Sequence, residues 1–208
     1  MRIQFEKRTD QNKAINFLIP IISFVLALLF NGVILILFGI NPIQAYSVMI
    51  KGSLGSSYAL TETLVKAIPL MLTGLGVSIA FQMHFWNIGA EGQLAMGGIA
   101  ASYIALFMQD SIPPSLILPT MFVVGMLAGA MWGLIPAGLK AALGVNEILT
   151  TLMMNYIAIL LVEYLYLGPW RDPKGYGFPG TAQFPKSAWL PRITGRVHYG
   201  IFFAIVGA

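Results

Sequence analysis

The chain has 208 residues, of which 57% are hydrophobic and 10% are charged. Soluble domains carry roughly 45–50% apolar and about 25% charged residues, so the composition predicts an integral membrane protein. The absence of cysteine from the sequence excludes a disulfide framework and a thiolate metal site. The net charge of +4 is modest, and no basic stripe with interleaved aromatic residues indicates nucleic-acid binding. Lipids and small solutes are the expected partners.

Four basic residues, Arg2, Lys7, Arg8 and Lys13, precede the first apolar stretch. This stretch is too long for the core of a signal peptide and lacks a small-residue cleavage site, so we expect a retained first helix. An excess of Lys and Arg marks the cytoplasmic side of a membrane protein. The sequence therefore predicts a multi-pass protein whose N-terminus is cytoplasmic.

Five apolar stretches are long enough to cross a hydrocarbon core of about 30 Å. They cover residues 15–40, 64–83, 88–108, 114–138 and 148–168. Because the bilayer offers no water to unpaired backbone groups, such stretches form helices. The predicted fold is an all-α, polytopic transmembrane helix bundle with about five complete spans. The polar segments between the spans, including 41–57, are expected to be loops.

The polar segment 82–93, QMHFWNIGAEGQ, lies between the second and third stretches. The apolar run after it, Leu94–Met108, covers about 22 Å as a helix, so a spanning helix must begin near Asn87. Glu91 would then lie inside the membrane or at its edge. An ionised carboxylate there costs at least ~2.5 kcal/mol unless it faces water or a partner.

Two interpretations of this segment stay open. It is either a short cytoplasmic turn whose polar groups meet water, or a broken membrane helix that lines a solute path, since irregular backbone at depth is tolerated only beside a cavity. On a continuous helix Asn87 and Glu91 would share one face, but Gly89 and Gly92 make that continuity doubtful. The candidate pathway residues are Asn87, Glu91 and Gln93.

The fourth stretch carries Gly125, Gly129 and Gly133, a stripe against which a neighbouring helix can pack closely. After this stretch, Asn146 and Glu147 are typical of a helix N-cap followed by an acid in the first turn. From the residues alone, the connection between the fourth and fifth stretches is a short amphipathic element or, more simply, a tight turn between two helices.

Residues 168–198 are expected to form a long extracytoplasmic loop if the first helix sets the orientation. The loop carries five basic residues against the single Asp172, and charge alone would place it in the cytoplasm. Residues 199–208 are apolar again but cover only about half a span. We expect them to begin a sixth helix, and we expect residues 1–208 to form a single transmembrane domain that is incomplete at its C-terminus, a fragment of a longer protein.

Motifs for catalysis are absent from the sequence. It has no GxxxxGK[ST] phosphate loop, no HExxH and no GxSxG, so no catalytic residue, metal ligand or cofactor is predicted. Two functions are compatible with the polar residues within the apolar stretches. A gradient-driven secondary transporter would use Glu91 or Glu163 for protons. An intramembrane serine hydrolase, the less favoured alternative, would pair Ser78 with His84 or His198.

Four motifs in the same order resemble the permease subunits of bacterial ABC importers, in the ribose and branched-chain amino acid superfamily. The nucleoside-importer branch is the most similar. The motifs are NIGAEGQ at 87–93, AIPLMLTGLGVSIAF at 67–81, GVNEILTTLMMNY at 144–156 and GPWRDP at 168–173. The resemblance covers essentially the whole chain.

The resemblance implies a non-enzymatic permease subunit in the bacterial plasma (inner) membrane that forms the path for nucleosides or related simple sugars. The implied partners are a second permease subunit, a cytoplasmic ABC ATPase and an extracytoplasmic substrate-binding lipoprotein. The 168–198 loop would contact the binding lipoprotein, and Asn87, Glu91 and Gln93 would line the path. The candidate ATPase-coupling residues are Lys140, Leu143, Gly144, Val145, Asn146 and Glu147.

Overall fold

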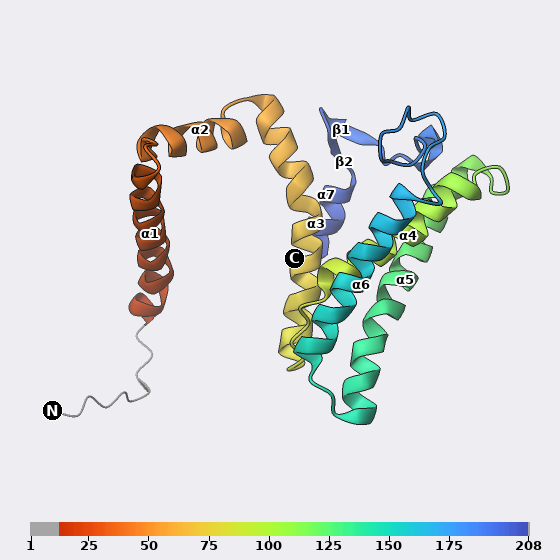
Figure 1. Ribbon diagram of the computed structural model, residues 1–208, viewed down its shortest axis with the longest axis horizontal. Helices are drawn as coiled ribbons and strands as arrows, with labels where there is room; N and C mark the ends of the chain where they lie inside the picture. The colour runs from red at the N-terminus through yellow and green to blue at the C-terminus, as the bar shows by residue number, and fades with distance from the viewer. Residues whose placement is uncertain (1–12, 208) are drawn as a thin grey trace. The chain divides into compact units, whose positions relative to one another are not determined.

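The computed structural model describes residues 13–207, with side chains from Phe17 onward. Seven α-helices make up most of this part of the chain (Figure 1), which confirms the predicted all-α fold. Their bounds are α1 Lys13–Leu37, α2 Pro42–Leu54, α3 Ser57–Gln82, α4 Ala90–Phe107, α5 Pro114–Leu143, α6 Glu147–Leu167 and α7 Gly200–Gly207. The short elements between α6 and α7 are the 3-10 helix η1 Lys186–Ala188 and the antiparallel strands β1 Arg192–Thr194 and β2 Val197–His198.

Four of the described helices are long and apolar enough to cross a membrane, namely α1 from Phe17 on, α3, α5 and α6. They coincide with four of the five predicted stretches, so the chain is a multi-pass membrane protein. The fifth stretch, 88–108, forms α4, whose 18 residues cover about 27 Å. Arg2, Lys7 and Arg8, on which the predicted orientation of the N-terminus rests, lie outside the described residues.

Contacts divide the chain into two compact units, Met1–Leu60 and Thr61–Ala208. In the first unit α2 replaces most of the loop expected at 41–57. Asn41 caps α2 by accepting hydrogen bonds from two backbone N–H groups, and Pro42 occupies the first turn, a combination that favours helix initiation. The Tyr46 hydroxyl donates to the Leu28 carbonyl at 2.7 Å and fixes α2 against α1.

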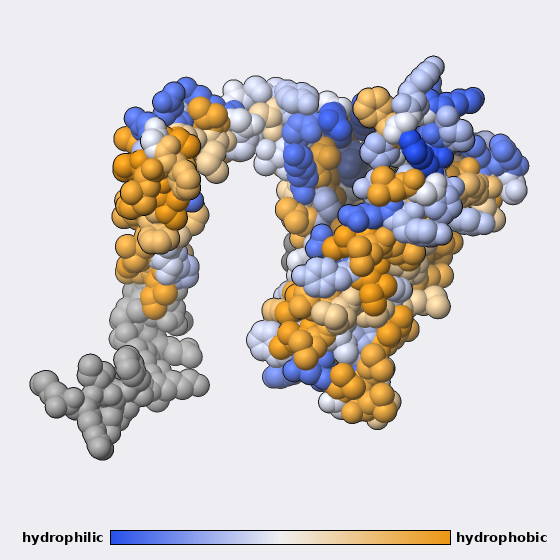
Figure 2. Space-filling view, viewed as in Figure 1, coloured by the Kyte–Doolittle hydropathy of each residue, from blue (hydrophilic) through white to orange (hydrophobic). Residues whose placement is uncertain are grey.

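Large apolar side chains of α1 are mostly exposed, as those of Phe24 (65%) and Phe30 (70%) illustrate. Figure 2 shows apolar side chains over the visible face of α1 and a mixture of hydrophilic and apolar ones over α2. A helix that is apolar all round is typical of a membrane span, where lipid or other helices cover it.

In the second unit α4 lies against both α5 and α6 (Figure 1). The close approach of α4 to α5 depends on glycine. A Cβ atom added to Gly97 would lie 2.9 Å from the Gly125 carbonyl oxygen, and one added to Gly129 would lie 3.0 Å from the Gln93 carbonyl oxygen. The predicted packing role of the glycine stripe in α5 is therefore confirmed.

The end of the chain packs along α3. The stretch after His198 forms a helix, α7, as expected, and Gly200 lies beside Ile68, which is only 4% exposed. The turn between β1 and β2 approaches the first turns of α3, where Arg196 Nη1 lies 2.9 Å from Glu62 Oε1.

Residues 168–198 form an ordered segment rather than an open loop. Arg171 and Thr181 form an antiparallel bridge that closes its first part. Ala188 of η1 is buried in a cluster with Ala105 of α4 and Ile117 of α5. The segment is therefore fixed over one end of α4 and α5.

Candidate functional site: a polar junction at membrane depth

The backbone between α3 and α4 is not helical. α3 ends at Gln82 and α4 begins at Ala90, and His84 takes a left-handed conformation with φ 57°. Such a φ is uncommon outside glycine and breaks a helix. Asn87 therefore lies in the connecting segment, not on the helical face of Glu91 that a continuous helix would have given.

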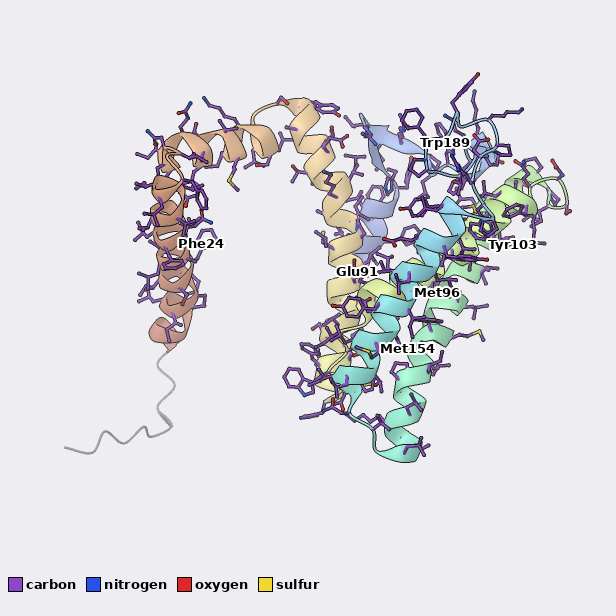
Figure 3. The ribbon with its side chains drawn as sticks, in the orientation of Figure 1. Phe24, Glu91, Met96, Tyr103, Met154 and Trp189 are labelled. Carbon is purple, nitrogen blue, oxygen red and sulfur yellow. The ribbon has the colours of Figure 1, made fainter. Side chains whose placement is uncertain are left out.

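This segment reaches well into the length of α6. Thr151 and Asn155 follow Glu147, the first residue of α6, by four and eight positions, which corresponds to about 6 and 12 Å along the axis. The Ile88 N–H donates to Thr151 Oγ1 at 3.2 Å, and Asn155 Nδ2 donates to Glu91 Oε2 at 3.3 Å. In Figure 3 Glu91 likewise lies partway along the helices of this unit. The contacts favour a broken membrane helix over a turn at the membrane surface.

Side chains satisfy the backbone groups that the break leaves free. The Gly92 N–H donates to Asn155 Oδ1, the Gly89 N–H donates to Asn87 Oδ1 at 3.0 Å, and Lys140 Nζ donates to the His84 carbonyl at 3.1 Å. An irregular backbone within a membrane persists only where such partners are supplied. The polar residues around the break therefore have a structural role in addition to any role in transport.

Two glycines let the segment approach α6. A Cβ atom added to Gly89 would lie 2.8 Å from the Thr151 carbonyl oxygen, and one added to Gly92 would lie 2.9 Å from Asn155 Cα. Thr151 and Asn155 are 1% and 8% exposed. Sequence reasoning did not select these two residues, although polar residues four apart on an apolar helix share one face and are a signal for such a site.

The three predicted pathway residues separate into two groups. Asn87 and Gln93 line a cavity of about 270 Å³ together with Thr73 and Gly76 of α3, and Asn87 Nδ2 donates to Gln93 Oε1 at 3.4 Å. Glu91 does not line this cavity. Its carboxylate is exposed and meets Asn155 on the side of α6.

The predicted coupling residues cluster where α5 meets α6. α5 extends to Leu143, Gly144 ends it with a left-handed φ of 66°, and Asn146 caps α6 by accepting from the N–H groups of Ile148 and Leu149. The predicted N-cap is confirmed. A separate short element does not form, because residues 139–143 continue α5. The connection is a tight turn, and Leu143, the last residue of α5 before it, is 70% exposed.

Lys140 connects the turn between α5 and α6 with the broken segment. Its Nζ atom lies 2.6 Å from Glu147 Oε1, donates to the His84 carbonyl and lies 5.2 Å from the centre of the Phe85 ring. The two predicted sites, distant in sequence, are therefore adjacent in the structure.

Residues of the alternative functions are not brought into comparable sites. Within the described part of the chain, no hydrogen bond joins Ser78 to His84 or His198, and His198 Nδ1 accepts from the Gly200 N–H. Glu163 lies near the far end of α6 and is exposed.

Comparison with known proteins gives a consistent set of relatives. The family described as branched-chain amino acid transport system, permease component, matches residues 59–207. A glucose ABC transporter permease of Haloferax volcanii is 41% identical over 181 residues, 87% of this chain and 47% of that protein. A nucleoside ABC transporter permease of Lactococcus lactis is 38% identical over 154 residues, 74% of this chain and 42% of the relative.

A guanosine ABC transporter permease of Bacillus subtilis is 33% identical over 196 residues, 93% of this chain and 56% of that protein. The chain thus spans about half the length of the curated relatives it matches. No solved structure matches it.

Proposed function

Because the chain belongs to the family of permease components of branched-chain amino acid transport systems, we propose that it is a transmembrane permease subunit of an ATP-driven importer for nucleosides or related simple sugars. Its relatives are glucose, nucleoside and guanosine permeases, and they support this solute class. The subunit is a transport component and not an enzyme, and a separate chain hydrolyses ATP.

The observation that carries the proposal is the polar junction. A broken helix whose Asn87 and Gln93 line a cavity supplies hydrogen-bonding groups at a depth where only a solute route or a protein partner needs them. Glu91, Asn87 and Gln93 are the proposed pathway residues, and residues 1–208 are part of one permease domain.

We assign two of the proposed partners to the two ends of α5 and α6, namely the turn that joins these helices and the 168–198 segment that follows α6. A cytoplasmic ABC ATPase contacts the turn formed by Leu143, Gly144 and Val145, a second permease subunit completes the pore, and an extracytoplasmic binding lipoprotein contacts the 168–198 segment. We further propose that the protein resides in the bacterial inner membrane with its N-terminus in the cytoplasm, as the basic N-terminal residues indicate.

Replacing Leu143, Gly144 and Val145 by charged residues should reduce the amount of ATPase that co-purifies with the permease. Leu143 is 70% and Val145 37% exposed, so their exchange removes apolar contact surface from a partner without opening a core. The matched control carries charged residues at Ile43 and Val48 of α2, exposed at 80% and 63%. Unchanged co-purification and unchanged uptake in the triple variant would exclude the coupling assignment.

Purine or pyrimidine nucleosides should compete for uptake more strongly than free ribose. The assay is competition against a labelled nucleoside in whole cells that express the complete transporter, with glucose as a further competitor because one relative is a glucose permease. Competition by ribose without competition by nucleosides would contradict the proposed solute class.

A gradient-driven secondary transporter is the second candidate, and the exposed carboxylate of Glu91 at membrane depth is the observation that favours it. The two functions differ in their energy source. Uptake that survives collapse of the proton gradient and stops when ATP is depleted supports the importer, and the reverse pattern supports the secondary transporter.

A further inference from the structure

A pocket of about 320 Å³ lies between α4 and α6, beneath the 168–198 segment. Gly98 and Ser102 of α4, Tyr166 of α6, and Trp170 and Thr181 of the segment contribute to its wall. Pockets that hold one small molecule start at about 300 Å³. This pocket is therefore large enough for a single small solute.

The pocket extends from Ala95, one turn of α4 after Glu91, to Trp170 and Thr181 of the 168–198 segment. Tyr166 follows Asn155 on α6 by a distance of about 16 Å along the helix axis. Tyr166 lies near the end of α4 that Tyr103 marks in Figure 3. Lys140 of α5 and Glu147 of α6 lie at the opposite end of these helices. The pocket opens between α4 and α6, whereas the cavity lined by Asn87 and Gln93 lies between α3 and α4.

The aromatic wall is held in place before any ligand binds. The backbone N–H of Trp170 donates to the Leu165 carbonyl at 2.9 Å. The centre of the Trp170 ring lies 5.5 Å from the centre of the Phe107 ring, edge to face. The bridge between Arg171 and Thr181 fixes the other side of the opening. Such a preformed wall lowers the ordering cost of binding.

Three hydroxyl groups at this wall lack a protein partner. Among the described residues, no hydrogen bond joins the side-chain hydroxyl of Ser102, Tyr166 or Thr181 to another group of the chain. Hydroxyls beside an acyl chain would stay unsatisfied at a cost in free energy, whereas a hydroxylated solute can pair with them. A largely apolar, partly aromatic wall that includes hydroxyl-bearing residues suits a ring that carries hydroxyl groups.

We propose that this pocket is an outer solute site that takes a small hydroxylated ring, a nucleoside or a monosaccharide, with Trp170 as the stacking surface and Ser102 and Thr181 as hydrogen-bonding groups. The identity of the solute rests on the proposed function. Both solute types share an apolar ring face and hydroxyls, and the binding measurement separates them.

The experiment measures equilibrium binding of labelled guanosine and of labelled glucose to the purified full chain in lipid nanodiscs. We expect saturable binding of at least one of them. Trp170→Ala should weaken that binding roughly tenfold or more, since aromatic stacking contributes this much to base recognition. Trp189→Ala, a tryptophan of the same segment that does not line the pocket, should leave it unchanged.

Thr181→Val provides a second variant, because valine keeps the shape of threonine and the backbone bridge to Arg171. It should weaken binding several-fold, while Thr194→Val in the exposed strand β1 should not. The proposal is overturned if neither solute binds saturably. It is also overturned if the Trp170→Ala and Trp189→Ala variants bind the solute with equal affinity, or if the Thr181→Val and Thr194→Val variants do.

The binding assay contains no ATPase and no binding lipoprotein, so it separates the site from the proposed function. Pocket-dependent binding without ATP-driven uptake in cells would leave the site and reject the importer. ATP-driven uptake without pocket-dependent binding would leave the importer and reject the site.

Discussion

Gly92→Ala should destabilise the folded chain by roughly 1–3 kcal/mol, the range for forcing an extra methyl group into a packed contact. A Cβ atom at this position would lie 2.9 Å from both Cα and Oδ1 of Asn155 and 3.3 Å from Ala158 Cβ. The Asn155 backbone cannot move aside without displacing α6, so α4 must shift and weaken the hydrogen bonds that hold the break. Thermal unfolding in detergent and abundance in the membrane measure the effect.

Gly98→Ala is the matched control in the same helix. A Cβ atom at Gly98 meets nothing within 4 Å, and alanine is favoured over glycine in a helix by up to about 1 kcal/mol. This variant should be as stable as the parent or slightly more stable. Equal stability of Gly92→Ala and the parent would show that the close contact between α4 and α6 does not form.

Glu91→Gln should leave the protein folded and reduce uptake several-fold. The amide keeps the size of the side chain and one oxygen that can accept from Asn155 Nδ2, so the packing persists. The exchange removes the negative charge of the ionised side chain. A charge within the membrane costs free energy and is typical of a solute or ion pathway, so its removal should affect transport. Uptake of a labelled nucleoside, normalised to the amount of permease in the membrane, gives the readout.

If the carboxylate only faced bulk water at a surface turn, the same exchange would change stability by no more than about 0.5 kcal/mol and would leave uptake unchanged. Uptake by the parent protein that depends on the proton gradient, together with complete loss of that uptake in Glu91→Gln, would instead favour the secondary transporter.

The sequence was sufficient to predict the helices and their ends where the signals are local. Hydropathy located the spans, the Gly125 stripe indicated close packing, and Asn146 indicated the start of α6, since caps and periodicity depend on neighbours in the chain. α2 was missed because its 13 residues are too few and too polar for a span, although Asn41 and Pro42 are the start signal of a helix.

The arrangement of the site could not be predicted from the sequence. The hydrogen bonds between the NIGAEGQ segment and the side chains of Thr151 and Asn155 join residues 63 or 64 positions apart. No local sequence pattern shows which helices pack together. The positive φ of His84 likewise has no signal in the sequence, nor does the placement of Asn87 in a cavity with residues of α3 that Glu91 does not line. The link through Lys140 follows from the same tertiary packing.

Accessibility of residue 87 tests most directly whether the broken segment lines the solute route. The sequence contains no cysteine, so in an Asn87→Cys variant this chain carries a single thiol for a membrane-impermeant reagent, and its labelling is read on this chain in the assembled transporter. Leu143→Cys, on the turn between α5 and α6, is the control that should react fully under all conditions. We predict that solute or ATP changes the extent of labelling at position 87. Full labelling at position 87 that neither solute nor ATP alters, as at position 143, would contradict the account.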